Sequence, residues 1–262
     1  MLVNRLTLSF DTGSAVVGQS SLSACVLVKR RGRQLLKATT ALICLLHLFV
    51  GALFYSSLFR TKNRMIQLYN ADCLQKLKDL SSNSVDLIIC DLPYGILNIQ
   101  RTNYNTLTST SCYTNQTWDV KLDLHALWKE LWRVRKDKRT PVLMFCSVRY
   151  FMDLAVVGRE SYQYSLIWKK NRGTNFMDAN RKPLQDFEMI AVFSDIRPFF
   201  IRKEGKCMTT TLEFDVPSKR KHPTEKPLEL YKFLIERYCP PGGTVLDPTF
   251  GSVNSGVASH AL

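Results

Sequence analysis

The sequence lacks the patterns of several familiar binding sites. Its eight cysteines form no Cys-x-x-Cys pair and have no histidine pair nearby, which argues against a zinc site. It contains no G-x-G-x-x-G string, the usual fingerprint for a dinucleotide. Internal repeats and low-complexity tracts are also absent. Cys90 and Cys146 lie in apolar runs, as small buried residues do, and this cysteine usage favours a reducing compartment such as the cytoplasm.

Positive charge is spread unevenly along the 262 residues, whose net charge is +14. Residues 1–64 contain nine Lys or Arg and one acid, whereas residues 65–262 contain 27 bases and 21 acids. The larger part is therefore moderately basic. Such a balance suits a polyanionic partner, although many proteins without one are equally basic.

The first 64 residues differ in character from the rest. Residues 41–59 are almost wholly apolar and uncharged, and 19 helical residues span about 28 Å, enough to cross a hydrocarbon core. The basic and hydrophobic segment 1–64 is therefore either a membrane-anchoring extension, with a transmembrane helix at 41–59, or a stretch foreign to a protein that naturally starts at Met65. We prefer the second interpretation, with a cytoplasmic protein, because the regular pattern begins abruptly at Met65.

From Met65 onward, strand and helix patterns alternate. Continuous apolar runs are typical of strands covered on both faces, and apolar residues at helical spacing indicate amphipathic helices. We predict strands at 65–69, 84–90, 141–146, 164–168, 189–193 and 244–247, and helices at 73–80, 122–135 and 227–238. This order predicts one α/β domain, residues 65–262, built on a largely parallel sheet.

The string Asp91-Leu92-Pro93-Tyr94-Gly95 directly follows a predicted buried strand. It therefore lies at the carboxyl end of that strand, where ligands bind in open α/β sheets. A carboxylate beside an aromatic ring suits a planar ring that carries an exocyclic amine: the ring stacks on Tyr94, and the amine donates to Asp91 and to a nearby backbone carbonyl. Taken alone, the string fits a turn capped by an acid, with Tyr as a packing residue, somewhat better than a catalytic loop.

Three further strings are weak evidence individually. Asp247 ends a predicted strand, and the glycine loop after it leads into a helix of small residues, a shape that lets a ligand approach backbone. Thr224 is a candidate cap for the helix at 227–238, and Lys226 is placed to meet an anion such as a carboxylate. Asp72, after the first strand, either caps the next helix or contacts a ligand at the same edge.

Together, these strings resemble the permuted (beta-type) amino-methyltransferases of DNA, which modify N6 of adenine or N4 of cytosine, and especially the phage and prophage adenine-specific type. The matching stretches are Met65–Gly95, Tyr164–Phe193 and Lys221–Ala258. The resemblance covers nearly all of 65–262 and none of 1–64. It implies a Rossmann-like, circularly permuted methyltransferase fold, S-adenosyl-L-methionine as the cofactor, DNA as the partner, and no metal.

The resemblance also implies roles for individual residues. Asp91, Pro93 and Tyr94 are the expected catalytic residues: Asp91 holds the target amine while its lone pair attacks the sulfonium methyl group, and Tyr94 stacks on the flipped base. Leu92, through its backbone carbonyl, and Gly95 are expected to contact the base with Tyr94. The expected cofactor-binding residues are Asp72, Thr224, Lys226, Asp247, Pro248, Phe250 and Gly251.

An Asp at position 91, rather than Ser, favours N6-adenine over N4-cytosine. Methylation of N4-cytosine, RNA or a protein amide remains an alternative, as does a nucleic-acid-binding remnant with weak catalysis. Basic residues in loops after strands are candidates for DNA phosphate contacts. They are Lys169, Lys170, Arg172, Arg181 and Lys182.

The sequence also departs from the family pattern. Val253 stands where the family usually has Gly, and residues 96–117 and 195–221 are expected to be loop or target-recognition segments. The chain ends at Leu262, inside the helix after the cofactor loop. We therefore expect a C-terminally truncated fold that lacks the strand carrying the ribose-binding acid. This would leave the strand at 65–69 without its central neighbour and the chain with weak activity.

Overall fold

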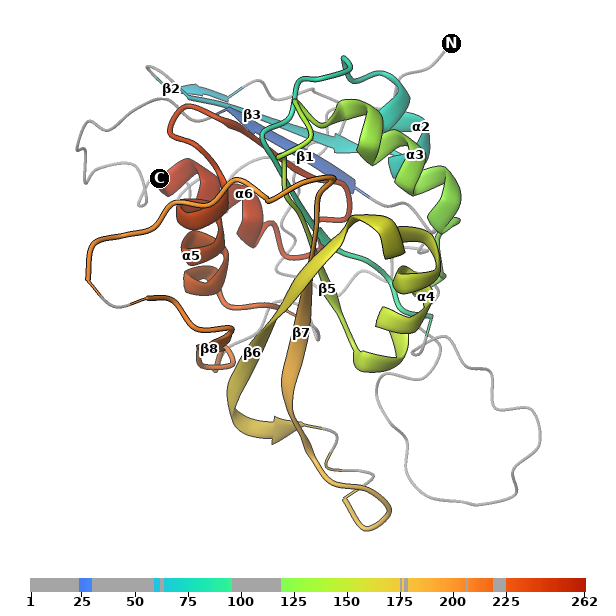
Figure 1. Ribbon diagram of the computed structural model, residues 1–262, viewed down its shortest axis with the longest axis vertical. Helices are drawn as coiled ribbons and strands as arrows, with labels where there is room; N and C mark the ends of the chain where they lie inside the picture. Colours follow the sequence, from blue (N-terminus) through green and yellow to red (C-terminus); the bar gives the residue numbers. More distant parts are fainter. Residues whose placement is uncertain are drawn as a thin grey trace, which may run out of the picture.

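The computed structural model describes residues 24–29, 59–61, 64–95, 119–174, 176, 179–205, 207–218 and 225–262. In these residues a nine-stranded sheet forms the centre of the molecule, with helices on both faces (Figure 1). The strands, in spatial order, are β2 (Phe59–Thr61), β3 (Arg64–Asn70), β1 (Ala24–Lys29), β9 (Thr244–Asp247), β4 (Leu87–Asp91), β5 (Val142–Cys146), β7 (Gln185–Phe193), β6 (Tyr162–Thr174) and β8 (Thr211–Glu213).

The helices form two layers over the sheet (Figure 1). One layer contains α5 (Leu228–Tyr238) and α6 (Asn254–Ala261). The other contains α2 (Cys73–Lys78), α3 (Leu124–Val134) and α4 (Val148–Gly158), which leads into the short 3₁₀ turn η1 (Arg159–Ser161). Each layer covers its own hydrophobic core.

The central strand β4 shows why the apolar runs of the sequence are continuous. Successive side chains of a strand point to opposite faces of the sheet. Leu87 and Ile89 accordingly join the core beneath α5 and α6, whereas Ile88 and Cys90 join the core beneath α2, α3 and α4. All four side chains are fully buried, so both faces of this strand require apolar residues.

The sheet is mixed, and the prediction of a largely parallel sheet is wrong outside its centre. β4 is parallel to β5 and β9, and β6 is parallel to β8. β7 runs antiparallel to both β5 and β6. The physical reason is the short connection between β6 and β7, since a parallel pair needs a crossover of a dozen residues or more.

A strand from the N-terminal segment occupies the position between β3 and β9. β1 pairs antiparallel with both neighbours; Val26, for example, lies opposite Leu68 on one side and Asp247 on the other. The expectation that the first strand of the predicted domain lacks a central neighbour is therefore wrong. The proposed domain boundary at residue 64 stays a prediction, because 1–64 is described only at β1, β2 and Arg64.

The apolar segment 41–59 lies outside the described residues, except for Phe59 at the start of β2. Within the described part of the chain, no helix has the length and apolar character needed to cross a membrane. The predicted loop segment 96–117 also lies outside the described residues.

Candidate functional site

The loop after β4 is held in place by a buried acid from a distant part of the chain. The Gly95 backbone N–H donates to Asp119 Oδ1 at 2.9 Å, and the Asp119 side chain is only 2% exposed. Gly95 has a φ of +69°, a conformation that favours glycine, and an added Cβ would lie 2.9 Å from Lys121 Cγ. Asp119 was not among the predicted site residues.

Asp91 ends β4 and faces a single ammonium group. Lys226 Nζ lies 2.9 and 2.8 Å from the two carboxylate oxygens of Asp91. Burial, the largest influence, raises the pKa of the Asp91 carboxyl, and the attraction of Lys226 offsets this only in part. The resemblance assigned Lys226 to cofactor binding; in the structure it pairs with Asp91 and also with Glu188, and the cofactor role stays a prediction.

Glu188 is a second buried acid at this site, and the sequence reasoning missed it. It lies on β7, is 8% exposed, and its Oε1 is 3.2 Å from Lys226 Nζ. Lys170 Nζ is 3.5 Å from its other carboxylate oxygen. Burial alone would raise the pKa of Glu188, but the two ammonium groups outweigh burial and leave that pKa below its usual value. The available signal was an acid that directly precedes the apolar run MIAVF of β7.

Tyr94 links the loop after β4, residues Asp91–Gly95 (the expected catalytic loop), to Glu188. Its hydroxyl donates to Glu188 Oε1 at 3.0 Å, and its ring lies 5.0 Å from the Tyr150 ring at 35°. Burial and then the charges of Glu188 and Asp91 raise the pKa of Tyr94 well above its usual value, so this hydroxyl remains a donor. The Tyr94 ring is therefore held by its tilted contact with the Tyr150 ring and by the hydrogen bond from its hydroxyl to Glu188.

The loop after β9 lies at the same edge of the sheet. β4 and β9 are parallel neighbours, so Asp91 and Asp247 both end strands at the carboxyl edge. Asp247 is 1% exposed and accepts from the Ser255 hydroxyl at 2.5 Å and from the Thr249 backbone N–H at 3.0 Å. Burial, opposed by these hydrogen bonds, raises the pKa of Asp247 to about 7. The Asp247 carboxyl thus stabilises the conformation of the loop through these two hydrogen bonds.

The loop from Asp247 to α6 leaves room for a ligand. Pro248 is buried and Phe250 half-buried, whereas Gly251 is exposed and an added Cβ there would meet no atom within 4 Å. The Thr249 hydroxyl is buried and has no hydrogen-bond partner among the described residues. A buried unpaired polar atom in a loop that also has an unobstructed glycine is compatible with a polar cofactor.

Val253 has a left-handed backbone at the start of α6. Its φ is 63° and its ψ is 7°, and its side chain makes no capping hydrogen bond. This conformation is strained for a β-branched residue and relaxed for glycine. The departure from the family's usual Gly at this position therefore strains the backbone.

Hydrogen bonds from α6 hold the segment before α5, which contains Glu225 and Lys226, at the carboxyl edge of the sheet. The Asn254 side-chain amide donates to Glu225 Oε1 at 3.0 Å and to the Lys226 backbone carbonyl at 2.8 Å. The catalytic loop, the segment before α5 and the loop after β9 therefore converge. Thr224 lies outside the described residues, and the N-cap of α5 is Pro227, so the prediction of Thr224 as its cap is wrong.

Asp72 follows β3, on the far side of β1. Its side chain accepts from the Gln75 backbone N–H at 3.0 Å and caps α2. This is the structural role that the sequence left open beside a ligand contact. The contact with the cofactor stays a prediction.

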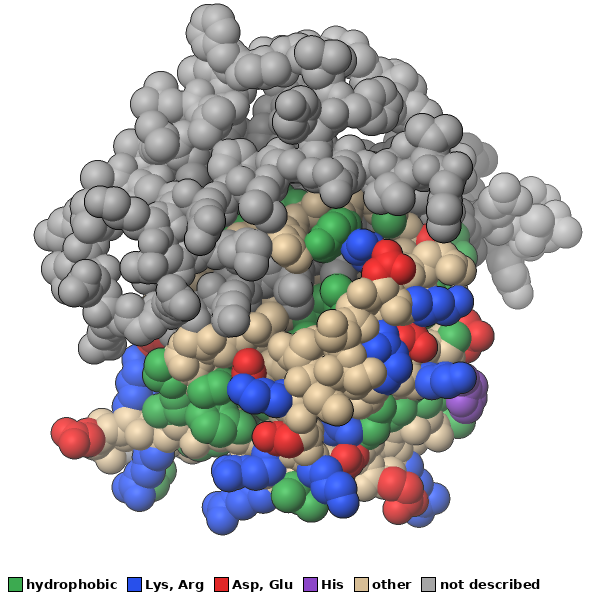
Figure 2. All heavy atoms as spheres, turned by 90° about the horizontal axis from the view of Figure 1, so that it is seen from above, with side chains coloured by type: hydrophobic (Ala, Val, Ile, Leu, Met, Phe, Trp, Pro, Cys, Tyr) green, Lys and Arg blue, Asp and Glu red, His purple; other side chains and the backbone are tan. Residues whose placement is uncertain are grey.

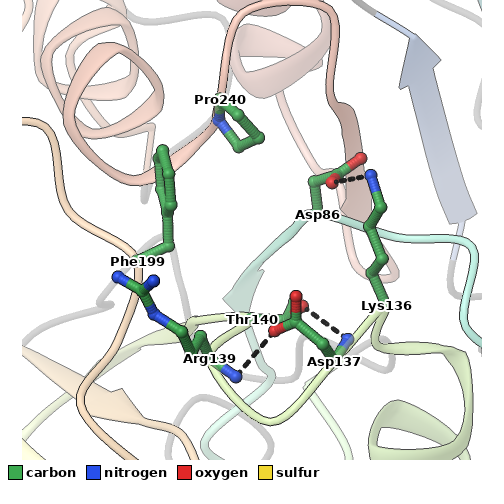
Figure 3. A pocket seen from close by; sticks show the side chains of 7 residues that line it. All are labelled: Asp86, Lys136, Asp137, Arg139, Thr140, Phe199 and Pro240. Atoms are coloured by element: carbon green, nitrogen blue, oxygen red, sulfur yellow. Dashed lines mark hydrogen bonds and ion pairs between the residues drawn. The ribbon is translucent and has the colours of Figure 1, made fainter.

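A small pocket of about 220 Å³ lies at the opposite edge of the sheet (Figure 3). Asp86 and Pro240 precede β4 and β9, so this pocket is at the amino ends of the strands. Lys136 Nζ pairs with Asp86 Oδ1 at 2.7 Å within it. We therefore locate the functional site at the carboxyl edge, where the strings converge.

Among the described residues, no group of three or more His, Cys, Asp or Glu side chains is arranged to hold a metal ion.

Comparison with known proteins agrees with this geometry. The sequence model of the N6/N4 DNA methylase family matches residues 85–262. The chain is similar to a solved structure of M1.HpyAVI in complex with SAM, with 25% identity, a TM-score of 0.54 and coverage of 74% of this chain and 87% of that one. It is similar in fold to the cytosine-N4-specific PvuII DNA methyltransferase, with 16% identity, a TM-score of 0.56 and coverage of 74% and 77%.

No curated protein matches the chain. The family match nevertheless spans more than half of the 262 residues, and it includes both the Asp91 and the Asp247 loops. The chain therefore belongs to the N6/N4 DNA methylase family and has the Rossmann-like α/β fold of S-adenosylmethionine-dependent methyltransferases.

Proposed function

We propose that this protein transfers a methyl group from S-adenosylmethionine to the exocyclic N6 of adenine in DNA. The observation that carries the proposal is the position of Asp91: its carboxylate ends a buried central strand beside the Tyr94 ring and one strand away from the Asp247 loop. A base amine and a methyl donor can meet between these two loops.

The Asp91 carboxylate and the Leu92 backbone carbonyl would accept the two N–H groups of the amine. The lone pair of an adenine amine is delocalised into the ring, and hydrogen bonds to both N–H groups favour a pyramidal nitrogen with a localised lone pair. Positioning and electrostatics therefore supply most of the rate. When bound, the cofactor supplies an electrophilic sulfonium methyl group.

Tyr94 would stack on the base, which must leave the duplex to reach Asp91. Extrusion costs a few kcal/mol, and stacking on an aromatic ring offsets part of that cost. The tilted contact with Tyr150 and the hydrogen bond to Glu188 hold the Tyr94 ring in one orientation before the base arrives. A fixed ring loses less conformational freedom on binding.

Asp247, Pro248, Phe250 and Gly251 would line the cofactor side. The open space at Gly251 and the unpaired Thr249 hydroxyl support this assignment. The strained backbone of Val253 at the same loop supports instead the alternative of a weakly catalytic protein that binds nucleic acid. An active methyltransferase and a weakly catalytic nucleic-acid-binding protein can be distinguished by whether methyl transfer is detectable.

The β6–β7 hairpin supports DNA as the substrate. Asp91 at the end of β4 pairs with Phe145 of β5, which in turn pairs with Ile190 of β7. The β6–β7 hairpin continues beyond this row of residues as far as the pair formed by Thr174 and Gln185. It therefore projects beyond the carboxyl edge (Figure 1). Three of its five predicted phosphate-binding residues are exposed: Arg172, Arg181 and Lys182.

The other two basic residues of the hairpin are already paired. Lys170 is 11% exposed and turns to Glu188, and Lys169 pairs with Glu213 at 2.9 Å, so the phosphate contacts of both stay predictions. On the face shown in Figure 2, Lys and Arg side chains of the described residues are interspersed with acids. The exposed hairpin residues are a cationic feature at the carboxyl edge of the sheet, where the site lies.

The deciding experiment is labelled-methyl transfer to unmodified duplex DNA, followed by digestion to nucleosides. We expect label in N6-methyladenine, and loss of at least about a hundredfold in rate for Asp91→Ala. Label in N4-methylcytosine would overturn the choice of base, and no label that depends on Asp91 would favour the non-catalytic alternative. RNA and a protein amide serve as parallel substrates.

A further inference from the structure

The role of Glu188 is not accounted for by the proposed roles of its neighbours. Its carboxylate is buried against three groups: the Tyr94 hydroxyl at 3.0 Å, Lys226 Nζ at 3.2 Å and Lys170 Nζ at 3.5 Å. Burying a carboxylate is costly unless it is paired and hydrogen-bonded, and Glu188 is both. Two of its partners belong to, or contact, the catalytic loop.

Lys226 creates a conflict at Asp91 that Glu188 relieves. The ammonium contacts both oxygens of Asp91, the same atoms that must accept an N–H of the substrate amine. An ammonium has three N–H groups, and a carboxylate has about four acceptor positions. One cation shared between two carboxylates therefore leaves more acceptor capacity on each of them than a closed one-to-one pair does.

We propose that Glu188 is a positioning residue for methyl transfer: it shares the Lys226 ammonium with Asp91, so that Asp91 keeps an acceptor oxygen for the target amine, and it orients the Tyr94 ring. The proposal rests on the proposed function, because it assigns Asp91 to the amine. Glu188 acts through Asp91 and Tyr94 and does not itself touch the substrate.

Two substitutions that replace a charged side chain by glutamine, Glu188→Gln and Lys170→Gln, should shift the pKa of Asp91 in opposite directions. The ionisable groups that face Asp91 from the packed elements are Lys226, Glu188, Tyr94, Tyr231 and Asp247, with Lys170 and Cys146 around Glu188. Glu188→Gln removes a negative charge that raises the pKa of Asp91. Lys170→Gln removes a positive charge, so Glu188 attracts Lys226 more strongly and the pKa of Asp91 rises.

The test is steady-state methyl transfer to duplex DNA as a function of pH, with saturating cofactor. For Glu188→Gln we expect kcat to fall on the order of tenfold to a hundredfold, as for a misplaced reacting group. The KM for S-adenosylmethionine should stay within about twofold. The acid limb of kcat should move to lower pH in Glu188→Gln and to higher pH in Lys170→Gln.

The matched control is Glu213→Gln, which removes an exposed acid from the ion pair with Lys169 on neighbouring strands. It should change neither kcat nor the acid limb. Thermal unfolding of each variant identifies any that fails to fold; if Glu188→Gln fails, the opposite shift in Lys170→Gln still decides the question.

Three outcomes are distinct. An unchanged acid limb in both variants, with the wild type active, overturns the role of Glu188 and leaves the proposed function intact. A fall in kcat with no pH shift also overturns it, because a merely structural role would produce that result. No methyl transfer by the wild-type protein overturns the proposed function and this inference together.

Discussion

Lys226 and Asp91, which are 135 residues apart in the chain, form an ion pair in which one ammonium contacts both oxygens of the carboxylate at 2.9 and 2.8 Å. The Lys226 side chain is 4% exposed, so this cation has little water around it. Burial lowers the pKa of Lys226, but the carboxylates of Asp91 and Glu188 outweigh burial and raise it above its usual value. The cation therefore stays charged throughout the neutral range.

Lys226→Met should destabilise the fold by about 3 kcal/mol at neutral pH. Removing one partner of a buried ionic group leaves uncompensated charge, and here the remaining acids, Asp91 and Glu188, repel each other. The loss should shrink as the pH falls, because protonation of either carboxyl relieves the repulsion. Urea denaturation at several pH values measures both effects.

The matched control is Lys232→Met, since Lys232 pairs with Glu229 on one face of α5 and is more exposed. This change should cost less than about 0.5 kcal/mol. Equal losses for both lysines would contradict the importance of burial at Lys226.

Val253→Gly should stabilise the protein by about 1 kcal/mol. The left-handed backbone at φ 63° strains valine, and glycine is also a better N-cap residue. Chemical denaturation checks the sign. As a comparison, Val257→Gly in the interior of α6 should destabilise by a similar amount, because glycine disfavours a helix interior. Destabilisation by both changes would show that Val253 is not strained.

Asp247 should make stability fall as the pH rises from about 4 to about 7. The folded-state pKa of its carboxyl, about 7, lies above the usual value of 3.8, so the folded state holds this proton more tightly than the unfolded state does. The contribution is therefore fully present below 3.8 and is lost as the pH rises through about 7. Asp247→Asn should flatten the pH profile of the unfolding free energy in this window; an unchanged slope would refute the assignment.

Leu27→Pro should destabilise the protein by about 1–3 kcal/mol. β1 has hydrogen-bonded neighbours on both sides, with Leu27 opposite Gln67 of β3 and Leu246 of β9. Proline removes a backbone donor and is not tolerated in an interior strand. Leu27→Val, which keeps the donor and a strand-forming side chain, is the control, and thermal unfolding is the measurement. Tolerance of proline would argue that β1 contributes little to the sheet.

Arg181→Ser in the β6–β7 hairpin should weaken DNA binding similarly for all sequences. If Arg181 contacts one phosphate, the slope of log affinity against log salt should fall by about 1. Titration of labelled duplex at several salt concentrations measures this slope. Lys232→Ser on α5, a lysine outside the hairpin, should leave it unchanged; an equal effect there would indicate general charge attraction.

Local elements followed from the sequence wherever one pattern decided them. The strand Thr244–Asp247 was predicted with its observed bounds, and the helix predicted at 227–238 begins one residue later, at Leu228. The predicted strand at 84–90 begins only at Leu87, and just before it the Asp86 side chain accepts the Thr244 backbone N–H. That hydrogen bond joins distant segments, so the local pattern could not indicate it.

Other elements were missed for a physical reason that can be named. α4 has no clean apolar stripe, because Val148, Met152 and Val156 are exposed on one side while Leu154 is buried on another. Its apolar residues therefore lie on more than one side, and no single apolar stripe marks the helix. The run ACVLVK of β1 is strand-like, but only its pairing with β3 and β9 makes it part of this sheet.

The sequence by itself determined six of the nine described strands and the polar residues at their carboxyl ends, Asp91 and Tyr94 among them, since these depend on residue type and on neighbours in the chain. Only the tertiary structure decided which groups surround Asp91. Glu188 and Lys226 reach it from β7 and from the segment before α5, and buried charges are governed by distance in space. The residue types of the Asp91–Gly95 loop can therefore be interpreted from the sequence, whereas the charges that surround the loop are defined only by the tertiary structure.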